Sequence, residues 1–252
     1  MESFVNTDLR KFTLEVGLTE QHQFAYSKFS STTVALLKVV DSRKFAIDDG
    51  LKSVCVFLDL RKAFDVIKHD ILLAKLESYG IKGNTLQSFN SHLLGRSQFV
   101  VCRDSSSEPQ LLPFGVPQGS VLGTTLFNIH INNISKTCHN SDVALFADNT
   151  EFHFSSKDVG KAENRIIEDI RSISLRVSNN GLICNTKKTV TMVIASHRAV
   201  KTARDVRMSY GDSLLEPRRS FKYLSAIVDE LLYFGTVAYL MSPPESTPNL
   251  SC

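Results

Sequence analysis

The stretch DVALFADNTEFHFSS, residues 142–156, decides the fold of this chain. Two apolar runs flank a polar turn at Asp148 and Asn149, which is the pattern of a β-hairpin. Further upstream, VCVFLDL at residues 54–60 is a continuous apolar run rich in β-branched and aromatic residues. Such a run predicts a strand that is buried on both faces of a sheet. We therefore expect a sheet with both of its faces covered.

Helical patterns surround these strands. An apolar residue at every third or fourth position predicts an amphipathic helix from about residue 158 to 178. Residues 1–30 carry no clear pattern. Further helices are expected over residues 31–49, 69–80, 85–95 and within 116–134, and further strands over 97–103, 109–114, 190–196 and 221–229. This order of elements predicts an α+β domain with a mainly antiparallel sheet.

Composition narrows the class of protein. The 252 residues are 42% hydrophobic and 22% charged, and the net charge of +3 is too mild to argue for nucleic-acid binding by itself. The five cysteines form no CxxC pair, so we expect reduced thiols rather than a zinc site or a disulfide framework. No apolar run approaches the about 20 residues that span a bilayer, and no targeting signal is visible. An intracellular protein with no membrane segment and no assigned compartment is expected.

Two aspartates stand at the ends of predicted strands. Asp59 ends the buried strand, and Asp148 lies in the hairpin turn. If the two strands are neighbours in one sheet, both carboxylates lie at the same edge, where they suit Mg²⁺ and a phosphate-bearing substrate. Taken singly, each aspartate is more often a solvated or capping residue. The pair becomes a candidate metal site only through the sequence around it.

Six segments follow one another along the chain: QFAYSKFSSTTVALL (23–37), VFLDLRKAFDVIKHDILLAKLESYGI (56–81), GVPQGSVLGTTLFNIHIN (115–132), LFADNTEFHF (145–154), GLICNTKKT (181–189) and FKYLS (221–225). In order and spacing they resemble a fingers segment and five palm motifs of the reverse transcriptases of LINE-type (non-LTR) retrotransposons, jockey-like elements among them. Together the six segments make a specific signal. The resemblance covers roughly residues 20–228.

The resemblance implies a polymerase palm with an antiparallel sheet and packed helices. It implies a partial fingers segment over residues 1–50, the palm over residues 51–229, and a divergent, disordered tail over residues 230–252, with the thumb missing. The implied activity is RNA-directed DNA polymerisation, a nucleotidyl transfer. Its substrates would be an RNA template, a DNA primer and deoxynucleoside triphosphates, and its cofactor Mg²⁺, with Mn²⁺ as a substitute. The sequence indicates no protein partner.

Matching motif to motif gives each candidate residue a role. Asp59 and Asp148 match the catalytic metal ligands. Phe64 matches the bulky gate that excludes ribonucleotides by clashing with a 2′-hydroxyl, although without the motif a core aromatic would be the simpler interpretation. Gln118 and Gly119 match the loop that approaches the template–nucleotide pair, and glycine lets the backbone come close there.

Two lysines complete the implied site. Lys188 matches the lysine of the fourth motif, a donor to the leaving pyrophosphate, and a solvated surface lysine is the equally simple alternative. Lys28 is the remaining cation of the fingers segment, where contact with the triphosphate is expected.

One departure from the motifs falls on the active site itself. The third motif usually ends in two aspartates, and here the second is Asn149. Asparagine has nearly the same shape but no charge, so the turn should survive while the metal site degenerates. We expect a rate loss on the order of a thousandfold. Further departures are Ala25, Ser27 and Phe29 in the fingers segment, Thr124 in place of proline, Asn133 in place of aspartate, and Ser225 in place of glycine.

Three interpretations stay open on the sequence alone. The chain is a weakly active polymerase palm, a non-catalytic relic of a retroelement, or a nucleic-acid-binding module that reuses the palm groove. The third would use the basic residues Arg198, Lys201, Arg204, Arg207, Arg218, Arg219 and Lys222, for which a solvated surface is the simpler alternative. An unrelated α/β protein with accidental motifs is the remote fourth interpretation.

Overall fold

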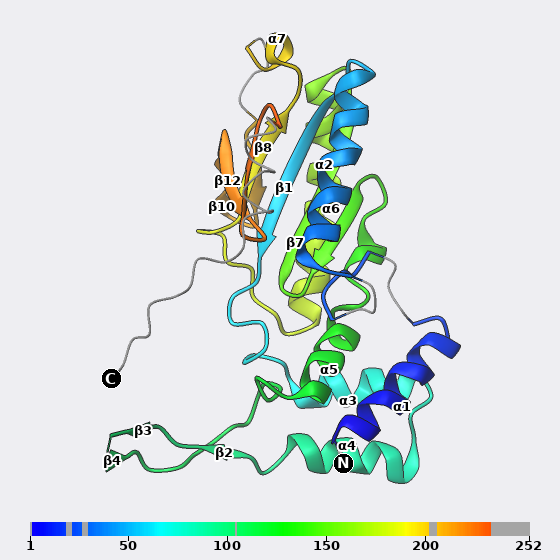
Figure 1. The fold of residues 1–252 in the computed structure, drawn as a ribbon, viewed down its shortest axis with the longest axis vertical. Helices are drawn as coiled ribbons and strands as arrows, with labels where there is room; N and C mark the ends of the chain where they lie inside the picture. The colour runs from blue at the N-terminus through cyan, green and yellow to red at the C-terminus, as the bar shows by residue number, and fades with distance from the viewer. Residues whose placement is uncertain (1, 19–21, 27–29, 104, 202–205, 233–252) are drawn as a thin grey trace.

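The computed structural model describes residues 2–18, 22–26, 30–103, 105–201 and 206–232. A five-stranded sheet forms one half of the elongated molecule and a group of helices forms the other half (Figure 1). Within the described residues, no helix is both long and apolar enough to cross a membrane. The predicted α+β class is confirmed. The division into a fingers segment, a palm and a tail stays a prediction.

The central sheet has the strand order β11-β8-β1-β7-β6. All neighbours are antiparallel except β11 and β8, so the predicted antiparallel character is confirmed. The strands are β1 (Lys52–Asp59), β6 (Asp142–Phe146), β7 (Asn149–Ser156), β8 (Val190–Ile194) and β11 (Glu216–Pro217). The hairpin of β6 and β7 is the one that the sequence predicts. Its turn lies one residue earlier than expected, at Ala147 and Asp148, because Asn149 already pairs with Phe146.

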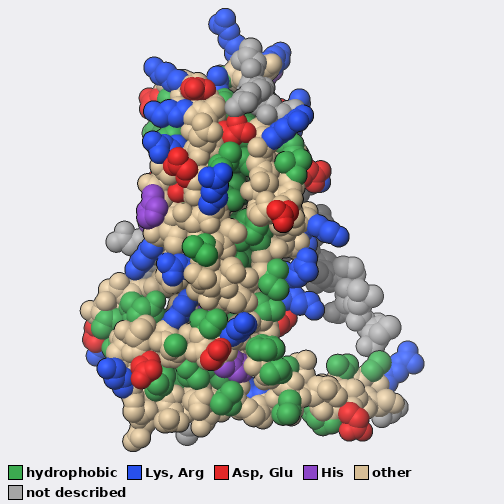
Figure 2. All heavy atoms as spheres, turned by 180° about the vertical axis from the view of Figure 1, so that it is seen from behind, with side chains coloured by type: hydrophobic (Ala, Val, Ile, Leu, Met, Phe, Trp, Pro, Cys, Tyr) green, Lys and Arg blue, Asp and Glu red, His purple; other side chains and the backbone are tan. Residues whose placement is uncertain are grey.

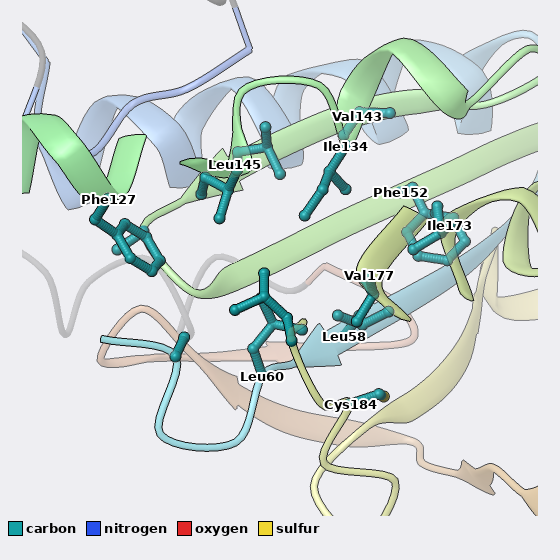
Figure 3. Close-up of a cluster of buried hydrophobic side chains, with 14 of the residues drawn as sticks. Leu58, Leu60, Phe127, Ile134, Val143, Leu145, Phe152, Ile173, Val177 and Cys184 are labelled. Atoms are coloured by element: carbon teal, nitrogen blue, oxygen red, sulfur yellow. The ribbon is translucent and has the colours of Figure 1, made fainter. Parts of the chain in front are cut away.

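Strand β1 is buried on both faces, as its apolar run predicts. Val54, Val56 and Leu58 face the larger core, which is closed by the apolar side of α6. Side chains from β1, β6, β7 and two helices converge there (Figure 3). The helices on this side and below it are α3 (His69–Ser78), α4 (Gly83–Leu93), α5 (Val121–Ile131), α6 (Val159–Asn179) and the short η1 (Ser135–Thr137).

The opposite face of β1 carries Cys55 and Phe57 and is covered by a smaller core. Helix α2 (Thr32–Asp48) lies over this face, and so does the hairpin of β12 (Ser220–Tyr223) and β13 (Ala226–Asp229). A buried ion pair joins α2 to the sheet, since Arg43 donates to Glu151 of β7. The partner charge compensates a carboxylate that would otherwise be costly to bury.

A second polar junction joins the ends of three helices. The ammonium group of Lys75 in α3 donates to the backbone oxygen of His130, to Oδ1 of Asn180 at 2.8 Å and to Oδ1 of Asn133 at 3.4 Å. Burial, with a smaller contribution from Arg176, lowers the pKa of Lys75 to about 8. The charged amine is thus surrounded by neutral acceptors.

One predicted strand differs from the structure, and one helix had no prediction. Residues 221–229 do not form a single strand, because the chain reverses at Leu224 and Ser225, whose φ angles are 48° and 70°. Serine is common in turns, but a positive φ favours glycine, so neither Leu224 nor Ser225 indicates this reversal locally. Helix α1 (Glu2–Glu15), which packs against α5, was not predicted either. The remaining short elements are α7 (His197–Val200), β9 (Ser209–Tyr210) and β10 (Ser213–Leu214).

The two strands predicted over residues 97–103 and 109–114 contribute to a projecting arm, residues 96–103 and 105–112. Short pairs hold it together, with β2 (Ser97–Gln98) against β5 (Gln110–Leu111) and β3 (Val101–Cys102) against β4 (Ser105–Ser106). The arm extends away from the helices (Figure 1) and carries apolar side chains on its surface (Figure 2). Phe99, Val100 and Leu111 are all exposed.

Candidate active site

The candidate site lies where β1 ends and β7 begins. Asp59, the last residue of β1, stands directly opposite Asn149, the first residue of β7. Asp148 precedes Asn149 in the hairpin turn. Because the two strands are antiparallel neighbours, the end of one and the start of the other meet at the same sheet edge. The sheet therefore brings together the two aspartates that the sequence singled out.

A turn that follows α6 fastens Asp59 in place. Nδ2 of Asn185 donates to Oδ2 of Asp59 at 2.8 Å, and the backbone nitrogen of Asn185 donates to the backbone oxygen of Asp59 at 2.8 Å. The hydroxyl of Thr189 accepts from the backbone nitrogen of Asp59 at 3.2 Å. Sequence reasoning missed Asn185, although it lies inside the GLICNTKKT segment. The same turn carries Lys187 and Lys188 to the edge of the sheet.

The electrostatics of the edge favour a cation. Burial raises the pKa of the Asp148 carboxyl, and the negative charge of Asp59 raises it further, while Lys188 acts in the opposite direction. The charge of Asp59 thus makes ionisation of Asp148 more costly, and a bound cation would relieve that repulsion.

The donor set fits one divalent ion. Mg²⁺ in proteins is held through one or two carboxylates together with substrate phosphates. Asp59 and Asp148 can provide the two carboxylates. Within the described part of the chain, no group of three or more His, Cys, Asp or Glu side chains is arranged to hold a metal ion. Asn149 stands at the position where the matching motif usually has a second aspartate. Its amide is a poorer ligand for a hard cation than a carboxylate.

Phe64 lies in the loop after β1 and lines the same pocket as Asp148 of the hairpin turn. Its ring stacks on Phe127, with centroids 4.1 Å apart, and meets the edge of Tyr26 at 6.3 Å. One side of Phe64 therefore belongs to the core, as the simpler interpretation held. The residue also lines a pocket of about 300 Å³, which we call the gate pocket, together with Tyr26, Gln118, Gly119, Thr124 and Asp148.

Hydrogen bonds join the loop after β1 to the loop before α5. The backbone nitrogen of Val116 donates to the backbone oxygen of Phe64 at 2.9 Å, and Nε2 of Gln118 donates to Oδ1 of Asp65 at 2.6 Å. These bonds hold Phe64 and Gln118 beside the same pocket.

Two glycines make this junction possible. Gly119 has a φ of +79°, a conformation that side-chain-bearing residues rarely adopt. Gly115 has a φ of +91°, and an added Cβ would lie 3.0 Å from the backbone of Asp65. The ring nitrogen Nε2 of His69 lies 2.7 Å from the backbone oxygen of Gly115, and this hydrogen bond ties the loop to α3.

A second pocket, of about 480 Å³, is lined by Asp59 and Asn149 among other residues; we call it the lysine pocket. Its apolar floor contains Phe57, Val190 and Phe221. Its charged rim consists of Lys187, Lys188, Arg218 and Lys222. Lys188 is thus exposed at the mouth of a pocket that Asp59 also lines.

The basic residues of the C-terminal part separate into groups. Arg218 and Lys222 line the lysine pocket, whereas Arg198 and Lys201 lie at and just after α7. Arg219 lies 3.9 Å from Glu230. Arg204 and the predicted triphosphate contact Lys28 both lie outside the described residues.

Comparison with known proteins agrees with the motifs. The family model for reverse transcriptase (RNA-dependent DNA polymerase) matches residues 1–228. The probable RNA-directed DNA polymerase from transposon BS of Drosophila melanogaster is 26% identical over 93% of this chain and 26% of its own length. The RNA-directed DNA polymerase from mobile element jockey of the same species is 26% identical over 84% of the chain and 24% of its own length. The chain thus spans about a quarter of these curated relatives.

Solved structures share the fold. The telomerase of Candida albicans, in complex with a telomeric RNA fragment, superimposes with a TM-score of 0.62 at 16% identity, over 91% of this chain and 37% of that one. Apo telomerase of Candida tropicalis gives a TM-score of 0.60 at 12% identity, over 92% and 40% of the two chains. At these identities the likeness concerns the fold alone. From the family match and the transposon relatives, the chain belongs to the reverse transcriptase family and is a reverse transcriptase domain of the LINE (non-LTR) type.

Proposed function

We propose that this chain is the polymerase domain of a retrotransposon protein in which RNA-directed DNA synthesis is impaired. The observation that carries the proposal is the register of β1 and β7. Asn149 stands directly opposite Asp59, at the position where a further carboxylate would complete the metal site. The charge is missing at the edge where it would matter most.

The substrates that we propose are an RNA template, a DNA primer and deoxynucleoside triphosphates. Asp59 and Asp148 would hold Mg²⁺, or Mn²⁺ in its place, which in this family supplies the charge that activates the primer hydroxyl and stabilises the departing pyrophosphate. Phe64 would exclude the ribose 2′-hydroxyl from the gate pocket, and Gln118 with Gly119 would lie against the template–nucleotide pair. Lys188 would donate a proton to the leaving group.

Loss of one carboxylate should lower the rate without abolishing binding. Asp59 and Asp148 keep the charges that one ion needs. The missing third charge should cost transition-state stabilisation of about 4 kcal/mol, on the order of a thousandfold in rate.

Primer extension on an RNA template tests the proposal, with Mg²⁺ and separately with Mn²⁺. The natural chain should extend the primer barely or not at all, and Asn149→Asp should raise the rate strongly. Asn84→Asp, the same change at an exposed position of α4, is the matched control and should leave the rate unchanged. Efficient synthesis by the natural chain that Asp148→Ala abolishes would contradict the impaired site.

A second variant tests the gate. In the Asn149→Asp background, Phe64→Val should admit ribonucleotides while deoxynucleotide incorporation continues. Unchanged discrimination would leave Phe64 as a core residue only.

Nucleic-acid binding without catalysis is the second candidate function. Its support is the convergence of Arg218 and Lys222 with Lys187 and Lys188 on one pocket. If neither the natural chain nor Asn149→Asp extends a primer, a filter-binding titration against salt separates this candidate from an inert relic. A module that binds phosphates should weaken steeply as salt rises, and a flat response would favour the relic.

A further inference from the structure

The lysine pocket combines features that would bind an anion. Lys187, Lys188 and Lys222 stand at its rim with exposed side chains. Arg218 is partly neutralised, because its guanidinium donates to Glu216 at 2.8 Å. The three lysines therefore provide most of the positive charge at the rim.

The pocket carries less negative charge in this chain than it would with aspartate at position 149. Asp59 and Asn149 are neighbours across the strands and both line the pocket. One oxygen of Asp59 already accepts a hydrogen bond from Asn185, which softens its repulsion of an anion. With aspartate at position 149, two carboxylates would face the lysines, and a phosphate would need a bridging metal ion to approach them.

Asparagine at position 149 reverses this balance. It removes one negative charge, and its amide nitrogen can donate hydrogen bonds, which a carboxylate cannot. The apolar side chains of Phe57, Val190 and Phe221 lower the local polarity, which strengthens charge-assisted hydrogen bonds beside them.

We propose that the lysine pocket binds phosphate oxyanions without a metal ion, with Asn149 as a donor and the rim lysines as counter-charges. The substitution that weakens catalysis thereby creates a metal-free phosphate site. This inference deepens the second candidate function, because it assigns the lysine pocket a metal-free ligand and gives Asn149 a role there, and it does not depend on any DNA synthesis.

Two sources could supply the phosphate group, a free pyrophosphate or the backbone of a nucleic acid strand. Both present negatively charged, non-bridging phosphate oxygens, so the experiment needs one arm for each. Inorganic pyrophosphate and a short single-stranded RNA are the two probes.

Isothermal titration calorimetry of the full chain in EDTA measures metal-free binding. The natural chain should bind pyrophosphate. Asn149→Asp and Lys222→Ala should each weaken binding about tenfold, the usual effect of losing one hydrogen bond to a charged group. Lys161→Ala removes an equal charge from the exposed side of α6 and should leave affinity within about twofold, since exposed distant charges are screened. A cooperative thermal unfolding transition above the titration temperature would confirm that each variant is folded.

The RNA arm identifies the source. If RNA binds and pyrophosphate displaces it, with the same two variants weakened, the pocket takes a backbone phosphate. If pyrophosphate binds without displacing RNA, the pocket takes the free anion. No pyrophosphate or RNA binding in EDTA would overturn the proposal, and so would equal affinity of Asn149→Asp and the natural chain. Neither result bears on primer extension, which uses metal ions and is measured separately.

Discussion

Two asparagines of this chain occupy positions where the matching motifs carry aspartate, and their surroundings are opposite in charge. Asn149 stands beside the carboxylates of Asp59 and Asp148 at the sheet edge. Asn133 stands beside the ammonium of Lys75 at the junction of three helices. A carboxylate at the first position would add repulsion and serve catalysis, whereas one at the second would add attraction and serve stability. The same substitution thus has opposite physical consequences in the two regions.

The largest stability effect is expected at the helix junction. Asn133→Asp should raise the free energy of unfolding by about 2 kcal/mol, because Lys75 would gain a charged acceptor. Oδ1 of Asn133 already accepts from Lys75 and from Nδ2 of Asn180, so an aspartate would keep both contacts. Urea unfolding measures the change. Asn84→Asp is the exposed control, and an equal effect of both variants would contradict the comparison.

Alkaline pH should remove that gain. The pKa of Lys75 is lowered from 10.5 to about 8, so in the natural chain the unfolded state binds more protons between these values and stability from this group rises with pH. A carboxylate at position 133 would raise the pKa again. The advantage of Asn133→Asp should therefore be full below pH 8 and mostly lost by about pH 10.5. A pH-independent advantage would show that packing rather than charge produced it.

At the sheet edge the opposite sign is expected. Asn149→Asp should lower the free energy of unfolding by up to about 1 kcal/mol without divalent ions, because like charges would then face each other across β1 and β7. Added Mg²⁺ should reverse the loss by binding only the folded state. Thermal unfolding with and without Mg²⁺ measures both effects. Stabilisation by Asn149→Asp in EDTA would break the comparison.

A substitution at Ser225 involves no charge, so its effect on stability can be compared with the effects of Asn133→Asp and Asn149→Asp. Ser225 adopts a φ of 70° in the turn between β12 and β13, where the matching motif has glycine. Ser225→Gly should raise the free energy of unfolding by about 0.5–1 kcal/mol, because the relief of backbone strain exceeds the added entropy of the unfolded chain. Chemical denaturation at two salt concentrations checks this. The gain should not vary with salt, unlike that of Asn133→Asp.

Local patterns predicted the parts of the fold that depend on local physics. The apolar run before Asp59 and the alternation around Asp148 specify a buried strand and a hairpin, so the meeting of the two residues could be anticipated. Helix α1 was not predicted because it buries only Asn6, Leu9 and Thr13, and two of these are polar, so the sequence shows little apolar periodicity. Contacts between distant segments were also invisible. No pattern near Asn185 indicates that it bonds to Asp59, and none near Lys222 indicates a shared pocket with Lys187.

The projecting arm has a consequence for handling the protein. The two-stranded ribbon of residues 96–103 and 105–112 leaves backbone donors and acceptors open along its edges, beside the exposed side chains of Phe99, Val100 and Leu111. Such edges recruit other strands, so the chain should associate with itself as its concentration rises. A lysine in place of Val100 or Leu111 would act as a gatekeeper and keep the protein monodisperse for calorimetry.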